Sequence, residues 1–210
     1  MADLTEDEEE IAFQRLYGAW DSLDPAETVE FLRDFEAPWW VVGGWAIEAF
    51  TGVPRPHEDI DVVIFARDLP KLLDVVRGRY HAWGAGAGAL RPVNDTWPEL
   101  HDGASQVWLR EHATAPWITD CILSEDHEGQ WVSRRDPAWH APLDDVTWVA
   151  ADGIRYLRPE IVLQHKARLD RSKDLRDLVA AWPLLGENER AWLRDAVRRE
   201  DAEHRWLGVI

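Results

Sequence analysis

The sequence predicts an α+β fold in which a mixed β-sheet is flanked by helices and followed by a helical C-terminal region. Three observations favour it. Strand-like and amphipathic helical segments alternate between residues 39 and 76. Short runs rich in Trp, Val and Thr, separated by turn residues, fill the middle of the chain, and helical periodicity dominates after residue 158. This order of elements is typical of an α+β or mixed-sheet design.

The N-terminal segment is predicted to be a pair of acidic helices. Asp24-Pro25 provides an N-cap followed by a first helical position. Residues 1–36 contain 12 acidic and 2 basic residues, a net charge of −10. Apolar residues recur at helical spacing on both sides of this cap, at Phe13, Leu16, Tyr17 and Trp20 and at Val29, Leu32 and Phe35. We therefore expect an acidic helical extension over residues 1–36.

The next stretch is predicted to alternate strand and helix. Residues 39–44 form a short apolar run ending in two glycines, and residues 45–50 are helical, with Gly52 as the C-terminal stop. In residues 59–65, Ile60, Val62 and Ile64 alternate with the other side chains, as in a strand. Residues 69–76 carry leucines and a valine at amphipathic helical spacing.

The remainder of the chain is predicted to be short strands and then helices. The strands, mostly antiparallel, are expected at about 105–110, 117–123, 130–134 and 146–157. The GAGAGA run at residues 84–89 has no GK[ST] ending and meets Pro92, so we expect a flexible loop or turn and not a phosphate-binding loop. The C-terminal helices are expected at 159–170, 173–185 and 187 to about 207.

Composition excludes several classes of protein. The chain has 210 residues, a formal net charge of −17 and 46% hydrophobic residues, enough to form a core despite the charge. Cys121 is the single cysteine, so no internal disulfide can form. The N-terminus does not resemble a secretory signal, and the longest uncharged apolar run, residues 37–47, is too short to span a bilayer. We expect a cytoplasmic protein without a membrane partner.

The charge also bears on the choice of partner. No basic stripe is apparent, which disfavours nucleic acid, and a cationic partner fits better. The chain has 20 arginines and only three lysines. A retained lysine in so Arg-rich a chain suits a role as a compact point charge on phosphate.

Three aspartates form the main candidate catalytic group. Asp59 and Asp61 stand at i and i+2 on one predicted strand, so their side chains share a face and can bind one cation. Asp120 lies inside the apolar run WITDCIL, where a carboxylate needs a cation or hydrogen-bond donors to offset its desolvation. Carboxylates from two neighbouring strands suit two hard divalent ions. The alternative interpretation of Asp59 and Asp61 is an acidic residue in a turn followed by one on the solvent-facing side of a strand.

A pair of glycines forms the candidate phosphate site. Gly43 and Gly44 stand between a predicted strand and a helix N-terminus, where free amides and the helix dipole favour an anion such as a triphosphate. The alternative is an ordinary tight turn.

Two further residues are candidate nucleotide contacts. Lys166 lies on the same helical stripe as Val162 and Leu169 and faces inward; it contacts a phosphate or covers the core with its stem. His57 has three possible roles: it contacts the nucleotide, it orients Asp59 through a hydrogen bond, or it is an ordinary exposed loop residue. On the next helix, a structural role is expected for Asp174 and Asp177, which either order the helix or pair with Arg171 and Arg176.

These residues carry a family resemblance. The stretch GGWAIEAFTGVPRPHEDIDVVIF resembles the motif of the DNA polymerase β-like nucleotidyltransferases, and RPHEDID with the later TDC is similar to the aminoglycoside 2''-nucleotidyltransferases. The resemblance covers residues 39–65, 117–123 and 156–178. It implies that Gly43 and Gly44 bind phosphates and that Lys166 contacts the β- or γ-phosphate. It also implies that Asp59, Asp61 and Asp120 bind Mg²⁺, and that Asp120 takes the proton from the attacking hydroxyl.

The resemblance implies a domain division and a reaction. Residues 37–157 would form a nucleotidyltransferase α/β catalytic domain, and residues 158–210 a helical region that completes the nucleotide site. The expected reaction is the transfer of NMP, AMP from ATP, to a hydroxyl of a small cationic acceptor such as an aminoglycoside, with two Mg²⁺ ions and release of pyrophosphate. Candidates to attract the acceptor are Glu99, Asp102, Glu111, Glu125 and Asp126. Alternatives are a toxin-like enzyme acting on tRNA or protein, and a catalytically silent, antitoxin-like nucleotide-binding module.

Overall fold

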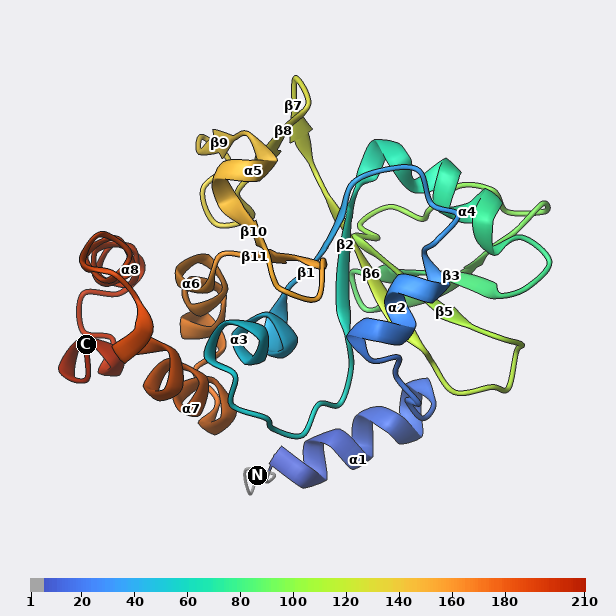
Figure 1. Cartoon of the computed structure of the whole chain (residues 1–210). Coiled ribbons are helices and arrows are strands. Elements are labelled where there is room, and N and C mark those ends of the chain that lie inside the picture. The colour runs from blue at the N-terminus through green and yellow to red at the C-terminus, as the bar shows by residue number, and fades with distance from the viewer. Residues whose placement is uncertain (1–5) are drawn as a thin grey trace. The chain divides into compact units, whose positions relative to one another are not determined.

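The computed structural model describes residues 6–210 (Figure 1). The chain forms two compact units. The first unit contains the chain up to residue 37 together with residues 58–123, and the second contains residues 38–57 and 124–210. Both combine β-strands with helices, and parallel and antiparallel strand pairs are present, so the predicted α+β fold with a mixed sheet is confirmed. Within residues 6–210, no helix is both long and apolar enough to cross a membrane. The predicted three-part domain division stays a prediction.

The first unit is built on five strands whose spatial order is β2-β6-β5-β3-β4. The pairs β6–β5, β5–β3 and β3–β4 are antiparallel. In chain order these strands are β2 (Asp61–Phe65), β3 (His81–Gly86), β4 (Ala89–Val93), β5 (Gln106–Arg110) and β6 (Thr119–Ser124). Their apolar side chains, with Val62, Ile64 and Leu109 among the most buried, form the core of this unit.

The helices of the first unit are α1 (Glu6–Tyr17), α2 (Pro25–Phe31) and α4 (Leu69–Val76), with a short 3₁₀ helix, η1 (Ala66–Asp68), before α4. Helix α2 begins as the sequence predicts. The Asp24 side chain accepts a hydrogen bond from the Glu27 backbone N–H at 2.8 Å, and the Glu27 side chain accepts one from Asp24 N at 2.9 Å. This reciprocal cap satisfies backbone donors that the helix itself leaves open.

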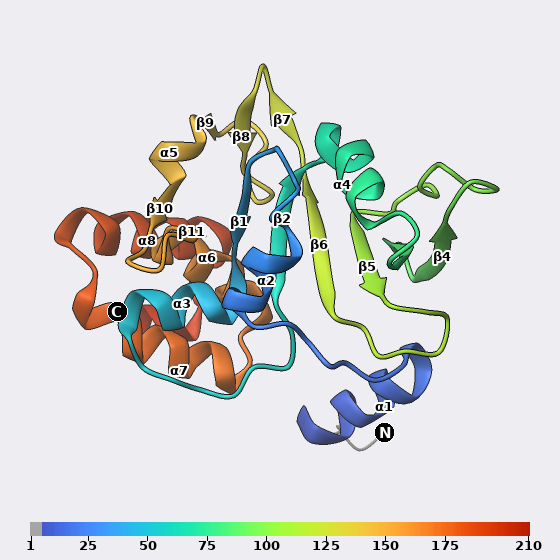
Figure 2. The same ribbon diagram turned by 45° about the vertical axis from the view of Figure 1, so that its right-hand side comes forward.

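The second unit pairs three strands with most of the helices. Strand β1 (Trp39–Val41) runs parallel to β11 (Arg155–Leu157), and β10 (Thr147–Val149) runs antiparallel to β11. Helix α6 (Pro159–Leu169) packs against α3 (Gly43–Thr51), α7 (Ser172–Ala181) and α8 (Glu187–Glu200), as Figure 2 shows. The remaining elements are β7 (Asp126–His127), β8 (Gln130–Val132), β9 (His140–Ala141), α5 (Leu143–Val146), η2 (Trp182–Leu184) and η3 (Arg205–Gly208).

Some predicted elements differ from those observed. The single strand expected at 146–157 is two antiparallel strands, β10 and β11, because the chain reverses through a turn in which Gly153 has φ +82°. The helices expected at 173–185 and 187–207 end earlier, and the short 3₁₀ helices η2 and η3 follow them. The GAGAGA run contributes to the hairpin β3–β4, with a two-residue turn at 87–88, so the expected turn is present and is shorter than the run.

Candidate functional site

The first unit brings together the two backbone segments that carry the three predicted carboxylates. Strands β2 and β6 are neighbours, and the Asp120 backbone N–H donates to the Ile60 carbonyl at 3.4 Å. The Thr119 hydroxyl lies 3.5 Å from the same carbonyl oxygen. Because Ile60 stands between Asp59 and Asp61 in the chain, this contact places Asp120 beside the aspartate pair.

The three carboxylates differ in their exposure. Asp59 is exposed and precedes β2, which begins at Asp61; Asp61 is half-buried, and the side chain of Asp120 is buried. Asp120 is the cross-strand partner of Trp108 on β5. Burial and the nearby Asp120 charge raise the pKa of the Cys121 thiol far above its usual range. Cys121 is therefore a protonated core residue and not a nucleophile.

The chemistry of this donor set suits a hard divalent cation, which prefers carboxylate oxygens. Within residues 6–210, no group of three or more His, Cys, Asp or Glu side chains is already arranged to hold a metal ion. The structure therefore provides suitable donors on neighbouring segments, and the assignment of Asp59, Asp61 and Asp120 as metal ligands stays a prediction.

The two predicted glycines lie in the second unit, where β1 leads into α3. Gly43 has φ +67°, a conformation that favours glycine. Gly44 leaves space for a different reason: a Cβ atom there would overlap the Arg55 guanidinium and lie 3.0 Å from His57 Nδ1, so the Arg55 side chain would have to shift. The first turn of α3 is thus covered by two side chains from the loop that follows this helix.

His57 is fixed by its neighbours. Its Nε2 lies 2.8 Å from Glu48 Oε2, and its ring stacks on Trp45 with centroids 3.7 Å apart and an interplanar angle of 11°. The same Glu48 oxygen accepts a hydrogen bond from the Arg55 backbone N–H at 3.0 Å. Burial lowers the pKa of His57, and the hydrogen bond to Glu48 opposes that shift only in part. His57 is therefore not an exposed loop residue, and its role towards a nucleotide stays a prediction.

Lys166 belongs to a buried network of ion pairs in the same unit. Its Nζ lies 3.1 Å from Asp174 Oδ1 and 2.8 Å from Asp177 Oδ2. The side chains of Lys166, Asp174 and Asp177 are 8%, 0% and 3% exposed, so the ammonium does not extend into solvent. A buried cation must be paired, and Lys166 is paired twice, so its ammonium does not extend to solvent as that of a snorkelling lysine would. Its contact with a phosphate stays a prediction.

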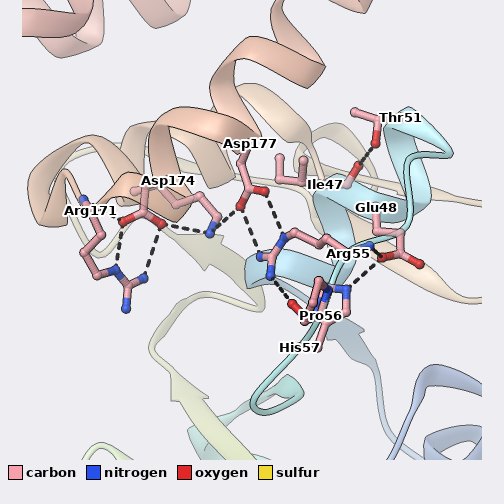
Figure 3. Close-up of polar contacts among 10 residues, drawn as sticks. Ile47, Glu48, Thr51, Arg55, Pro56, His57, Arg171, Asp174 and Asp177 are labelled. Carbon is pink, nitrogen blue, oxygen red and sulfur yellow. Dashed lines mark hydrogen bonds and ion pairs between the residues drawn. The ribbon is translucent and has the colours of Figure 1, made fainter. Parts of the chain in front are cut away.

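An arginine extends this network at each end (Figure 3). Arg171 Nε and Nη2 donate to Asp174 at 2.9 and 3.2 Å, which confirms the expected pairing of Asp174 with Arg171. Asp177 instead contacts Arg55, with Nε–Oδ1 at 2.9 Å and Nη2–Oδ2 at 3.2 Å. Burial alone would raise the pKa of Asp174, but the Arg171 hydrogen bond and the Lys166 charge outweigh it, so this pKa is lowered. A continuous path thus runs from Gly44 through Arg55 and Asp177 to Lys166.

Sequence reasoning assigned no role to Arg55 or Glu48. Arg55 stands 122 positions from Asp177, and nothing in the sequence links them. The available signal was local: Arg55 and His57 lie four and two residues before Asp59, respectively.

A cavity of about 550 Å³ lies elsewhere in the second unit. It is lined by residues of α6, α8 and the segments beside them, including Arg135, Asp170 and His204. None of the predicted site residues lines it.

Comparisons with known proteins bear on both groups of residues. Residues 26–82 match the family model described as aminoglycoside-2''-adenylyltransferase, and this segment contains the glycine pair and the Asp59–Asp61 pair. A search of curated proteins found no significant match.

Three solved structures are similar to this one. A crystal structure of ANT(2'')-Ia in complex with adenylyl-2''-tobramycin has a TM-score of 0.55 and 19% identity, over 83% of this chain and 95% of the other. A solution structure of the antibiotic-resistance factor ANT(2'')-Ia has a TM-score of 0.53 and 22% identity, over 84% and 90%. The lincosamide antibiotic adenylyltransferase LnuA, lincomycin-bound, has a TM-score of 0.52 and 18% identity, over 76% and 97%.

The fold is similar to that of nucleotidyltransferase structures, and the family match over residues 26–82 belongs to the same class of enzyme. Within this class the chain is similar to the aminoglycoside adenylyltransferases, which confirms the resemblance carried by its motifs.

Proposed function

We propose that this protein is a Mg²⁺-dependent nucleotidyltransferase that transfers AMP from ATP to a hydroxyl of a small cationic acceptor, such as an aminoglycoside, and releases pyrophosphate. One observation carries the proposal. The Ile60 carbonyl, between Asp59 and Asp61, accepts the Asp120 backbone N–H, in a chain whose residues 26–82 match the adenylyltransferase model.

Each carboxylate has a role in this account. Asp59, Asp61 and Asp120 would hold two Mg²⁺ ions, which when bound neutralise the triphosphate and stabilise the leaving pyrophosphate. Asp120 would accept the proton of the attacking hydroxyl. Its position supports this role, because the Asp120 side chain is buried and its backbone N–H contacts the Ile60 carbonyl between the other two aspartates.

The second unit supplies the proposed contacts to the nucleotide. The backbone amides at Gly43 and Gly44, at the start of α3, would donate to phosphate oxygens. Arg55 and His57 cover the same turn, and a guanidinium at the positive end of a helix is better accommodated when an anion is bound there. Lys166 would contact the β- or γ-phosphate; its Nζ is held between Asp174 and Asp177.

A small amine-bearing acceptor is supported by the neighbours and by charge. The similar structures include a complex with adenylyl-2''-tobramycin and one with lincomycin, so both antibiotic classes are candidate acceptors. The net charge of −17 favours a cation. The acidic residues proposed to attract it lie in both units: Glu99, Asp102 and Glu111 are exposed in the first, and Glu125 and Asp126 belong to the second.

The test is to incubate the protein with ATP, Mg²⁺ and a panel of aminoglycosides and lincosamides, measuring pyrophosphate and the mass of each acceptor. We expect pyrophosphate release that depends on one acceptor, together with an acceptor heavier by one adenylyl group. Asn substitutions of Asp59 or Asp61 should abolish the reaction. Asp74→Asn is the matched control for them, because Asp74 is an exposed aspartate on α4 of the same unit. If folded protein modifies no member of the panel, the small-acceptor claim is withdrawn. Transfer to tRNA or protein, or metal-dependent nucleotide binding without turnover, would then identify the alternatives.

A further inference from the structure

A short segment between α1 and α2 is paired with the chain just before β6. This segment, Ala19–Leu23, lies within the first unit. Trp20 and Trp117 form a parallel bridge. Three backbone hydrogen bonds of 2.9 Å hold the pairing, from Trp117 N to Ala19 O, from Asp21 N to Trp117 O and from Leu23 N to Ile118 O. The segment is therefore a fixed part of the first unit.

Aromatic contacts anchor the same segment. The Trp117 indole Nε1 donates to the Tyr17 carbonyl at 2.7 Å. The Trp20 ring lies edge-on to Trp108, with centroids 5.3 Å apart. Trp117 is fully buried, and Trp20 is half-buried. They fix the chain on the N-terminal side of Ser22.

Ser22 connects this segment to the chain just before β2 and just before β6, the two strands on or beside which the carboxylates lie. Its Oγ accepts a hydrogen bond from the Ile60 backbone N–H at 2.9 Å and donates a longer one, 3.4 Å, to the Ile118 carbonyl. Ile60 stands between Asp59 and Asp61, and Ile118 stands two residues before Asp120. One hydroxyl thus bridges the backbone of the aspartate pair and the backbone leading to Asp120.

The contact matters because Ile60 lies just before β2 begins. Its side chain is fully buried, and its carbonyl accepts from Asp120 N on β6. Its N–H is held by Ser22 and not by a strand ladder. Without the hydroxyl, the peptide between Asp59 and Ile60 would lose this hydrogen bond, and the position of Asp59 would be less defined.

We propose that Ser22 is a positioning residue for the cation site: its hydroxyl fixes the backbone of Asp59 and Asp61 against that of Asp120. The inference rests on the proposed function, which assigns a divalent cation to these aspartates. Ser22 lies outside the segment, 26–82, that matches the family model.

The experiment compares Ser22→Ala and Ser22→Thr in the full-length protein. Thr28→Val is the matched control, since Thr28 is buried in the same N-terminal region and its hydroxyl donates only to Asp24 O of its own helix, at 2.8 Å. Calorimetric titration with Mn²⁺, without nucleotide or acceptor, measures cation affinity. Hydrogen exchange of the Ile60 amide measures the contact itself, and thermal unfolding measures stability.

Ser22→Ala is expected to weaken Mn²⁺ binding about tenfold, the usual effect of losing a residue that orients metal ligands. It should also speed exchange at Ile60, while Ser22→Thr and Thr28→Val retain wild-type Mn²⁺ affinity. Should Ser22→Ala not fold, Ser22→Cys, with a weakly hydrogen-bonding thiol, is measured in its place.

Equal Mn²⁺ affinity in Ser22→Ala and wild type, or no Mn²⁺ binding by wild type, would overturn the inference. A different result would refute the proposed function alone. In that case wild type binds Mn²⁺ and Ser22→Ala binds it more weakly, but wild type transfers AMP to no acceptor. Transfer by wild type with unchanged Mn²⁺ affinity in Ser22→Ala would leave the function standing and remove the role of Ser22.

Discussion

The backbone N–H of Asp120 donates a hydrogen bond to the carbonyl oxygen of Ile60 at 3.4 Å. Ile60 is the residue between Asp59 and Asp61, so this bond joins two parts of the chain that each carry candidate metal ligands. The arrangement is built by the order of strands in the first unit, where β6 lies beside β2.

Asp61→Asn is expected to abolish nucleotidyl transfer while leaving the protein folded. An amide is a much weaker ligand for a hard divalent cation than a carboxylate, and we expect kcat to fall by about a hundredfold or more. Steady-state pyrophosphate release measures the rate, and thermal unfolding checks the fold. Asp74→Asn should retain activity. Retained transfer in Asp61→Asn would refute the metal assignment.

Gly44→Ala is expected to lower both stability and nucleotide affinity. The added methyl group would overlap the Arg55 guanidinium, so Arg55 and its contact with Asp177 must move. Overpacking of this kind costs about 1–3 kcal/mol. Urea unfolding and ATP titration measure the two effects. Gly208→Ala is the control, since a Cβ atom at Gly208 meets nothing within 4 Å. Equal behaviour of the two variants would contradict the account of Gly44.

Lys166→Met is expected to destabilise the protein by about 3 kcal/mol or more, because it leaves Asp174 and Asp177 buried with one fewer cation. Urea unfolding gives the change in the free energy of unfolding. Arg77→Met is the comparison: Arg77 and its partners are exposed, so its loss should cost less than about 1 kcal/mol. Similar losses for both variants would show that the Lys166 pairs contribute no more than a surface contact.

His165 is expected to make the stability depend on pH. Burial, and then the charges of Arg135 and Arg134, lower its pKa from 6.5 to about 4. Between these pH values the unfolded chain binds a proton that the folded protein excludes, so stability falls as pH decreases from 6.5 to 4. Urea unfolding at a series of pH values should show a shallower slope for His165→Gln, with the exposed His112→Gln as control. An unchanged slope in His165→Gln would contradict the buried, neutral state.

Local signals predicted much of the fold. The Asp24-Pro25 cap, the helix at 69–76 and the strand ending at Phe65 appear as expected, because caps and hydrophobic periodicity act over a few residues. The β3–β4 hairpin was not predicted. Gly and Ala have low β propensity, and this hairpin depends on pairing with β5 and on a close backbone approach at Gly86, where a Cβ atom would lie 2.2 Å from the Gly103 carbonyl oxygen.

The candidate site was predictable in its residue types but not in its contacts. The spacing of Asp59 and Asp61 and the apolar setting of Asp120 identified the carboxylates. Pairings between distant residues, such as Arg55 with Asp177 or Ser22 with Ile60, depend on tertiary structure. The spacing of residues along the sequence does not predict them. The N-terminal segment was expected only as an acidic extension, yet it supplies the hydroxyl that contacts the backbone between Asp59 and Asp61.

The most direct test of the central claim is the mass of the acceptor after incubation with ATP, Mg²⁺ and wild-type protein, beside the same reaction with Asp61→Asn. The account predicts an acceptor heavier by one adenylyl group with wild type, and an unmodified acceptor with folded Asp61→Asn. Equal modification by both proteins, or modification without a divalent cation, would contradict it.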